Sequence, residues 1–371
     1  MVKWHKSAVP TTLPPLVALA PMAGVTDIPV RAQVKVFGGR YCVSEMVASE
    51  QLARDRIDMV RRAAGSGVIS PLVIQLAGRE ARWMAEGARI AEDAGADVID
   101  INMGCPSKSV TSGLCGSALM RDPETALRLI EATVTATARP VTLKMRLGWD
   151  HASLNAADIA KRAEDAGVRM ITVHGRTRQQ FYAGSADWSA IAPIVEAVRI
   201  PVIANGDIAS ADDARRALAL SGAAGVMIGR AAQGRPWLPG AIEHALLHGG
   251  DATPPPRERL LASLLALYDD TLAFYPERLG VRVARKHIAW TIDAVLGSSA
   301  REARKAICML DDPTRVRAGL HALFGDAPDH PTTRSRTSDD GCANPVDARR
   351  AGAYSIAHAS AHRPRHAPAN P

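Results

Sequence analysis

Residues 92–101 read EDAGADVIDI, and residues 164–173 read EDAGVRMITV. A looser third copy, GAAGV, spans residues 222–226. In each copy a glycine stands just before a short apolar run. Glycine readily adopts the left-handed conformation that ends many helices, so each copy predicts a helix that leads straight into a buried strand.

Short apolar runs of this kind occur eight times, with amphipathic helical patterns between them. Runs this short and continuous are typical of parallel strands that are buried on both faces. Eight strand and helix units over about 225 residues match the size of a TIM barrel, a closed (β/α)8 sheet. A doubly wound open sheet is the alternative, but the sequence has no Rossmann glycine fingerprint. The predicted strands are Leu16–Ala20, Arg40–Ser44, Leu72–Leu76, Asp97–Asn102, Val141–Met145, Met170–His174, Val202–Asn205 and Gly225–Gly229.

A second region follows the predicted barrel, which we place at residues 12–245. Residues 249–256, GGDATPPP, read as a linker because they favour neither helix nor strand. Residues 257–325 carry leucine-rich amphipathic patterns, which predict a small helical bundle. Residues 331–371 are rich in proline, arginine and histidine, so we expect a disordered tail. The predicted fold class is therefore α/β, with a TIM barrel, a C-terminal helical-bundle domain and a tail.

Composition and cysteine usage exclude several classes of protein. Of the 371 residues 47% are hydrophobic, but no apolar run in the sequence reaches the length of a membrane span. The N-terminus has no secretory leader pattern, so we expect a cytoplasmic protein without membrane association. The five cysteines include no CxxC pair, so we expect no metal site or iron–sulfur cluster. The net charge of +7 is only a weak indication of a polyanionic partner.

Polar residues stand where several predicted strands end, which places them at the mouth of a barrel. Strand 7 leads into Asn205-Gly206-Asp207, and strand 8 leads into Gly229-Arg230. In TIM barrels the loops after these two strands commonly bind phosphate through glycine N–H groups. We therefore predict a phosphorylated ligand or cofactor here. The alternative is that the glycines only turn the chain.

Three further polar side chains, Gln75, Lys144 and His174, lie near the ends of apolar strands. A lysine inside a barrel mouth loses hydration, so it needs an anionic or carbonyl partner. A flavin provides such a partner, because its N1 and C2 carbonyl region gains negative charge on reduction. Gln75 and His174 are able to hydrogen-bond to the same ring. A packed neutral histidine is the alternative for His174.

Cys105 is the candidate for reactive chemistry. It stands between Gly104 and Pro106 directly after a predicted strand, in a loop that favours exposure over packing. A cysteine thiol is mostly protonated at neutral pH, so this side chain suits a proton donor as well as a nucleophile. Cys115, within the sequence LCGSA, reads instead as a small packed residue.

Five motifs stand along the chain in this order: PMAGVTD at 21–27, SEM at 44–46, NMGCPSK at 102–108, HGRT at 174–177 and NGDI at 205–208. They resemble, in sequence and in order, the motifs of the tRNA-dihydrouridine synthases, most closely the bacterial B-type branch. The likeness runs from about residue 12 to residue 325 and implies an FMN-binding TIM barrel followed by a helical domain. Two positions depart from the family pattern: Val30, where phenylalanine is usual, and Thr291 in the helical region, where tyrosine is common.

The resemblance also implies roles for individual residues. NADPH would reduce the flavin, and the flavin would pass a hydride to C6 of a tRNA uridine while Cys105 protonates C5. Asn102 would help to hold the uracil. The residues that would contact FMN are Pro21, Met22, Ala23, Gln75, Lys144, His174, Asn205, Gly206, Asp207, Gly229 and Arg230.

A uridine must leave the base stack to reach a barrel mouth, and basic residues would offset that cost through phosphate contacts. We expect a monomer that binds tRNA. Two alternatives stay open: a flavin barrel that acts on a free pyrimidine, which the helical region disfavours, and a non-catalytic RNA-binding or regulatory protein, which Cys105 and Lys144 disfavour. The candidate contacts, each otherwise a solvated surface charge, are Lys108, Arg176, Arg178, Arg282, Arg285 and Lys286.

Overall fold

The computed structural model describes residues 14–325, which form two compact units that divide after Pro255. The first unit contains a sheet with its surrounding helices, and the second contains helices. The predicted tail at residues 331–371 lies outside the described residues, as do residues 12 and 13 of the predicted barrel region. Over the described range, every helix is too short or too polar to cross a membrane.

Eight parallel strands close into a barrel, in which β1 pairs with both β2 and β8. The predicted TIM barrel is thereby confirmed, and the open doubly wound sheet is excluded. The strands are β1 (Val17–Leu19), β2 (Tyr41–Ala48), β3 (Val73–Ala77), β4 (Val98–Met103), β5 (Val141–Arg146), β6 (Met170–His174), β7 (Val202–Asn205) and β8 (Gly225–Ile228).

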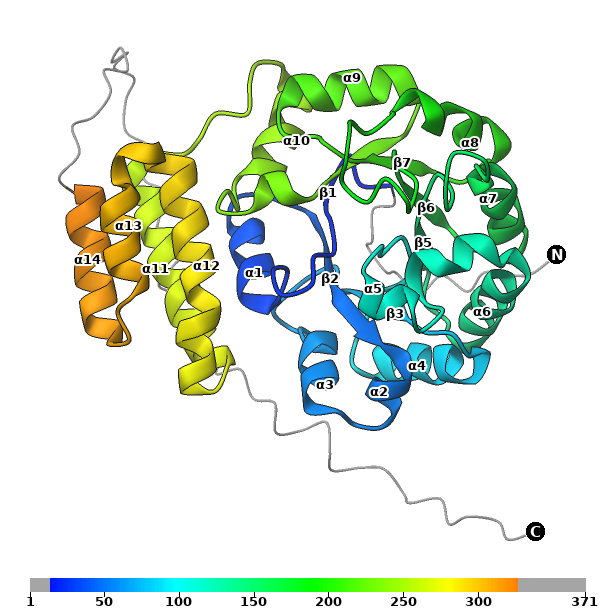
Figure 1. The fold of residues 1–371 in the computed structure, drawn as a ribbon, viewed down its shortest axis with the longest axis horizontal. Coiled ribbons are helices and arrows are strands. Elements are labelled where there is room, and N and C mark those ends of the chain that lie inside the picture. The colour runs from blue at the N-terminus through cyan, green and yellow to red at the C-terminus, as the bar shows by residue number, and fades with distance from the viewer. Residues whose placement is uncertain (1–13, 326–371) are drawn as a thin grey trace, which may run out of the picture. The chain divides into compact units, whose positions relative to one another are not determined.

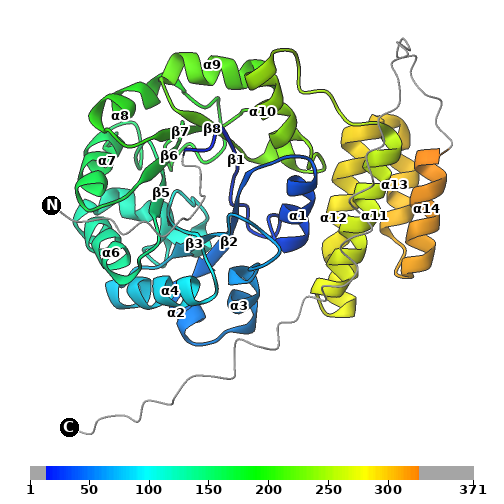
Figure 2. The ribbon, with the colours of Figure 1, turned by 180° about the vertical axis from the view of Figure 1, so that it is seen from behind.

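Helices follow the strands and surround the barrel, as Figures 1 and 2 show from opposite sides. The glycines of the repeated sequence have left-handed backbones, with φ of +90° at Gly95, +104° at Gly167 and +66° at Gly222. Each follows a helix and precedes a strand, as the repeats predict. The helices are α1 (Ile28–Val36), α2 (Ser49–Ala53), α3 (Ile57–Ala63), α4 (Ala81–Asp93), α5 (Lys108–Thr111), α6 (Pro123–Ala136), α7 (Ala156–Asp165), α8 (Ala192–Ala197), α9 (Ala211–Ser221) and α10 (Leu238–His248).

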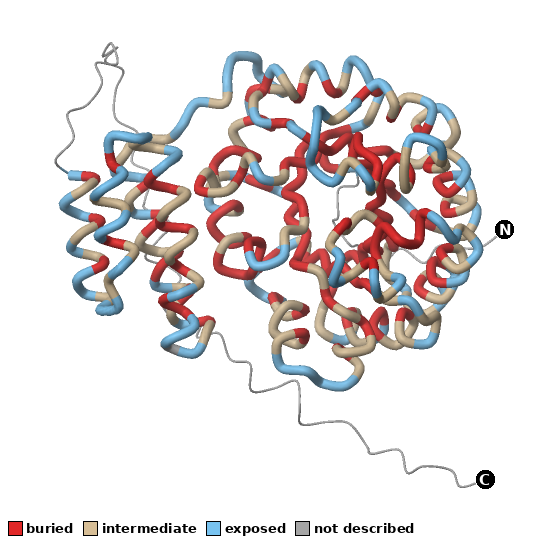
Figure 3. The backbone as a smooth tube through the Cα atoms, in the orientation of Figure 1, coloured by how far each residue is buried: buried red, intermediate tan, exposed pale blue. Residues whose placement is uncertain are grey.

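The barrel interior is apolar toward the amino-terminal ends of the strands. Val73 of β3 and Val98 of β4 belong to a buried cluster to which several other strands contribute, and Figure 3 shows the strands as a continuously buried region. Inward positions on a strand are two residues apart. The next inward side chains toward the carboxyl ends of β3 and β4 are therefore Gln75 and Asp100, so the interior becomes polar at the mouth.

Strand β2 is longer than the sequence predicts, because the predicted strand ends at Ser44. Its pairing with β3 contains a register shift, which is the signature of a bulge. Polar residues at the bulge lie inside the strand and not in a loop. The Glu45 carboxylate accepts a hydrogen bond from the Gly24 N–H at 2.6 Å, which ties the loop after β1 to β2.

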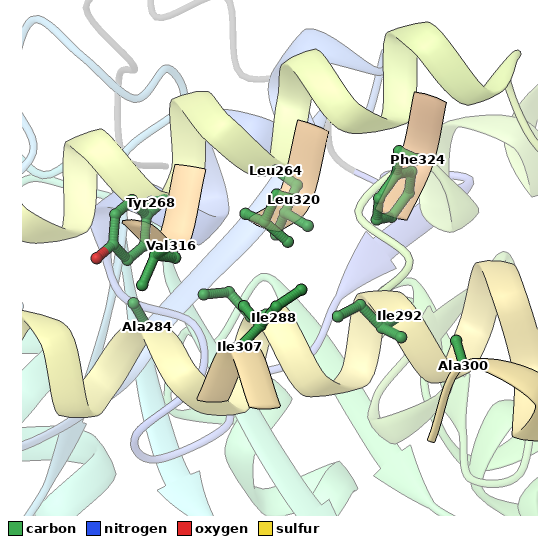
Figure 4. Close-up of a cluster of buried hydrophobic side chains, with 10 residues drawn as sticks. All are labelled: Leu264, Tyr268, Ala284, Ile288, Ile292, Ala300, Ile307, Val316, Leu320 and Phe324. Carbon is green, nitrogen blue, oxygen red and sulfur yellow. The ribbon is translucent and has the colours of Figure 1, made fainter. Parts of the chain in front are cut away.

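The second unit packs its helices around one apolar core, so the predicted helical bundle is confirmed. Figure 4 shows Leu264, Ile288 and Leu320 facing one another from three different helices, and each is at most 3% exposed. Thr291 also lies in this unit and is 5% exposed, so its departure from the family pattern is at a buried position. The helices are α11 (Arg257–Phe274), α12 (Glu277–Leu296), α13 (Arg301–Cys308) and α14 (Pro313–Gly325).

Gly280 lies inside α12 and not at its end. A Cβ atom at Gly280 would lie 3.2 Å from the Leu272 Cα and 3.2 Å from the carbonyl oxygen of Thr271. The glycine therefore allows α11 and α12 to approach closely. Its role is in packing, which a single sequence does not distinguish from a helix boundary.

Candidate active site

The predicted polar residues of the strand ends come together at the carboxyl end of the barrel. Gln75 of β3 pairs in register with Asp100 of β4, and Asn102 of β4 pairs with Lys144 of β5. Asn205 of β7 lies within hydrogen-bond reach of Lys144 across the interior. Side chains from four different strands thus form one polar layer above the apolar core.

A chain of hydrogen bonds runs across this layer to Cys105. Gln75 Nε2 donates to Asp100 Oδ2 at 2.7 Å, and Asn102 Nδ2 donates to Gln75 Oε1 at 2.7 Å. Asn102 Oδ1 in turn accepts from the N–H groups of Gly104 at 3.3 Å and Cys105 at 3.1 Å. The reactive candidate is therefore attached to the barrel wall through two side-chain amides.

Two members of this layer, Asp100 and Thr142, are absent from the residues that the motifs pick out. Thr142 Oγ1 donates to Asp100 Oδ1 at 2.5 Å, and Asp100 is 4% exposed. Burial raises the pKa of Asp100, while the hydrogen bonds from Thr142 and Gln75 oppose that shift. The available sequence signal is an acidic residue inside the apolar run VIDI, two positions before Asn102.

Lys144 is 9% exposed, and its Nζ donates to Asn205 Oδ1 at 2.9 Å. The Asn205 orientation is set by its other end, where Nδ2 donates to the Met227 carbonyl at 2.8 Å. Burial, with a smaller contribution from Arg146, lowers the pKa of Lys144 to about 8. An ammonium group in this position has donors to spare for a carbonyl or anionic ligand.

His174 ends β6 at the same level and is 8% exposed. Burial, reinforced by Lys144 and several arginines, moves its pKa well below the ordinary value. Its Nε2 lies 3.4 Å from an Arg176 Nη1. Because an arginine only donates, Nε2 is the acceptor there, and His174 is a neutral imidazole at the edge of the mouth.

Arg176 does not occupy the exposed position that a phosphate contact requires, and that expectation is corrected. It is 1% exposed. Its guanidinium donates to Asp207, with Nη1 and Oδ1 3.0 Å apart, and to the carbonyls of Ala183 and Gly184. Together with the His174 contact, these acceptors account for its five N–H donors. Arg176 instead supports the loop after β7.

The Asp207 carboxylate is likewise committed to protein partners. Besides Arg176, it accepts from the Ala186 N–H at 2.8 Å and pairs with Arg230 at 3.4 Å. The backbone of Asp207 has a φ of +54°, in the left-handed region. A contact from Asp207 to a bound phosphate would therefore come from its N–H group and not from its side chain.

The loops after β7 and β8 provide the small residues that a phosphate site requires. Gly206 has a φ of +117°, and a Cβ atom there would lie 2.7 Å from both Ala186 and His174. At Gly229 a Cβ would meet only Ala20, at 3.9 Å, so space is open beside this backbone. The Arg230 side chain is 55% exposed. A narrow glycine turn, an open backbone and one accessible cation together fit a phosphorylated cofactor.

The loop that carries Cys105 is held from both sides, and its side chain is partly exposed. The carbonyl oxygen of Cys105 accepts from the Ser117 hydroxyl at 2.8 Å, and that of Gly104 accepts from Arg146 Nε at 2.8 Å. Cys115 donates its thiol to the Gly113 carbonyl at 3.3 Å, and burial raises its pKa. Of the two cysteines, Cys105 alone has its backbone bonded to the polar layer.

The remaining predicted cofactor contacts, Pro21, Met22 and Ala23, form the turn after β1. This turn is closed by hydrogen bonds between Met22 and Thr26, including the Met22 N–H to the Thr26 hydroxyl at 3.0 Å. Ala23 is exposed, and Pro21 and Met22 are partly exposed. They lie at the carboxyl end of the barrel, as the sequence predicts.

The predicted RNA contacts differ in their surroundings. Lys108 is exposed at the start of α5, and Arg282 is exposed on α12. Arg178 stacks on the Trp149 ring at 4.7 Å, and Arg121 stacks on the same ring at 3.8 Å. Arg285 is ion-paired with Asp311 at 2.6 Å, and Lys286 is half-buried.

Comparison with known proteins identifies the family. The dihydrouridine synthase family model matches residues 18–322. A probable tRNA-dihydrouridine synthase of Rhodobacter capsulatus is 51% identical over 315 residues, 85% of this chain and 96% of that protein. One from Rhizobium leguminosarum is 50% identical over 84% of this chain and 96% of that protein. A tRNA-dihydrouridine synthase B of Xanthomonas axonopodis is 48% identical over 76% of this chain and 85% of that protein. The resemblance seen in the motifs is confirmed, and the chain is an enzyme that belongs to the dihydrouridine synthase family.

Proposed function

We propose that this enzyme reduces uridines of tRNA to 5,6-dihydrouridine in the cytoplasm, as a monomer that uses FMN and NADPH. The relatives at 50 and 51% identity are named for this activity. The observation that carries the proposal is the polar layer of the barrel mouth. There, Asn102 bonds the backbone of Cys105 at 3.1 Å and pairs in register with Lys144.

The residues of the mouth fit a flavin mononucleotide. Lys144 would donate to the carbonyl region of the ring, with Gln75 and His174 nearby. The N–H groups after β7 and β8, with Arg230, would hold the phosphate, and the turn at residues 21–23 would line the site. When bound, the flavin supplies a hydride for C6 of the uracil.

The chain itself supplies the proton and holds the base. Cys105 donates its thiol proton to C5, so the C5=C6 double bond becomes single and the thiolate is reprotonated from solvent. Asn102 already orients the Cys105 loop through Oδ1, and we assign it the uracil contact as well. The hydrogen bonds to the Cys105 loop would keep the acid at a fixed place relative to the base.

A tRNA uridine reaches this mouth only after it leaves the base stack. Trp149 holds Arg121 and Arg178 against its ring. Within residues 14–325 neither guanidinium forms an ion pair, and Arg121 is exposed, while the Nε of Arg178 is buried. We therefore propose the terminal N–H groups of both residues as contacts to RNA phosphates. Lys108 at the mouth and Arg282 on α12 are further proposed contacts.

The function is tested with unmodified tRNA transcript, FMN and NADPH, and with free uridine in parallel. We expect mass spectrometry to find the gain of two hydrogens in the tRNA alone. Reduction of free uridine without reduction of tRNA would support the free-pyrimidine alternative. Binding of tRNA with no product from either substrate would support the non-catalytic alternative.

The first prediction concerns pH. The Lys144 ammonium loses its proton as the pH rises through its pKa of about 8, so FMN affinity should be steady well below that pH and fall as the pH passes it. Lys144→Met should weaken FMN binding roughly 10- to 100-fold and remove this pH dependence, because a charge-assisted hydrogen bond is lost. The measurement is FMN titration across that pH range. Lys161→Met, an exposed lysine on α7, is the control and should bind FMN as the wild type does.

The second prediction concerns RNA binding. Arg178→Ala should weaken tRNA binding and reduce the slope of log affinity against log salt by about 1, while FMN reduction by NADPH is unchanged. Arg199→Ala is the matched control, since Arg199 is exposed just before β7, at the opposite end of the barrel. Equal salt slopes for the two variants would remove Arg178 from the RNA surface.

A further inference from the structure

The hydrogen-bond chain between Asp100 and Cys105 has a direction. At one end, Asp100 Oδ2 accepts a hydrogen bond, and at the other end the N–H groups of Gly104 and Cys105 can only donate. A side-chain amide carries one accepting oxygen and one donating nitrogen. The amides of Gln75 and Asn102 must therefore both point their nitrogen toward Asp100 and their oxygen toward Cys105.

Because these side chains are buried, neither amide can reverse its orientation without losing hydrogen bonds. Gln75 is 0% exposed, Asp100 4% and Asn102 7%. Rotation of either amide would place oxygen against oxygen or nitrogen against nitrogen, with little water available to replace the lost bonds. The accepting oxygen of Asp100 therefore fixes the orientation of the Gln75 amide, and the Gln75 amide in turn fixes that of Asn102.

We propose that Asp100 is a positioning residue for Cys105: as a hydrogen-bond acceptor it orients the Gln75 and Asn102 amides, which hold the Cys105 backbone. The role requires an acceptor and not a charge. Protonation of the Asp100 oxygen that faces Thr142 would leave Oδ2 free to accept from Gln75. The consequence for uridine reduction rests on the proposed function, but the effect on the loop does not.

The test compares three variants in the FMN-loaded enzyme. Asp100→Leu removes the acceptor, Asp100→Asn keeps an accepting oxygen without the charge, and Thr142→Val removes a bond to the same carboxyl that lies off the path to Cys105. The readout is amide hydrogen exchange at Gly104 and Cys105, measured by NMR as protection relative to the free peptide.

We expect Asp100→Leu to lower the protection of both amides about tenfold, the equivalent of one lost hydrogen bond. Asp100→Asn and Thr142→Val should stay within about threefold of the wild type. The single-turnover rate of uridine reduction by the pre-reduced, FMN-loaded enzyme should also fall in Asp100→Leu. If Asp100→Leu does not fold, Gln75→Met interrupts the same chain and should give the same loss of protection.

Three results would overturn the proposal. Wild-type protection in Asp100→Leu, or in Gln75→Met where that variant replaces it, would show that the loop does not depend on the chain. An equal loss in Thr142→Val would indicate general loosening of the polar layer. An equal loss in Asp100→Asn would assign the effect to charge. Absence of dihydrouridine with the wild-type enzyme would refute the proposed function and leave the exchange result intact.

Discussion

Cys105→Ala is expected to form dihydrouridine about 10²–10⁴-fold more slowly than the wild type in a single turnover, because it lacks the thiol that we propose as the acid for C5. The measurement uses pre-reduced enzyme and unmodified tRNA. FMN content and NADPH oxidation should be unchanged, since the thiol is not needed to hold the flavin or to reduce it.

Cys115→Ala is the control for general loss of a thiol. Its Sγ bonds to the carbonyl of Gly113 within its own loop, and its backbone is not attached to the polar layer. This variant should react at close to the wild-type rate. Wild-type turnover in Cys105→Ala together with failure of Cys115→Ala would mean that the acid is the other cysteine.

Asp207→Ala is expected to lower the free energy of unfolding by about 3 kcal/mol, toward the lower end of the range for a broken buried ion pair. The reason is Arg176, which is 1% exposed and would keep its charge without the carboxylate. Asp207 itself is about one-third exposed, which limits the loss. Chemical denaturation measures the effect, with a matching fall in FMN affinity because the loop after β7 loses its support.

Asp212→Ala breaks an exposed pair with Arg215 on α9 and should cost less than about 1 kcal/mol. Asp207 also gives the stability of the fold a pH dependence. Burial acts to raise the pKa of Asp207, but hydrogen bonds from Arg176 and Ala186 hold it below its usual value. A carboxyl with a depressed pKa stabilises the fold above its ordinary pKa of about 4 and loses that contribution as the pH falls. If Asp207→Ala and Asp212→Ala lowered the free energy of unfolding equally, the buried Arg176 would not require the Asp207 carboxylate for stability.

The barrel could be predicted because buried parallel strands leave a strong local pattern. The repeated EDAG sequences end helices at Gly95 and Gly167, and the apolar runs after them become β4 and β6. The candidate site could also be predicted from the sequence, for a related reason. Lys144 and Asn205 are polar residues within apolar strands, and such residues face a site or a partner more often than a packed core.

The rest depends on contacts between segments that are distant in the sequence. Arg176 and Arg178 look alike in the chain, and only the return of the loop to Ala183 and Gly184 buries the first of them. Asp100 reads as part of an apolar run until the strand register places it beside Gln75. A single sequence carries neither the path of a loop nor the register of a closed sheet.

On the proposed function, the polar layer also links folding to cofactor binding. Its members come from β3, β4, β5 and β7, so the complete site exists only after strands separated by most of the barrel sequence have paired. Such long-range pairing is slow compared with helix formation. A ligand that needs the whole layer binds the closed barrel and not its partly folded forms, and by mass action it stabilises only the closed form. The concentration of free cofactor would then determine what fraction of the newly synthesised protein is present as the closed, folded barrel.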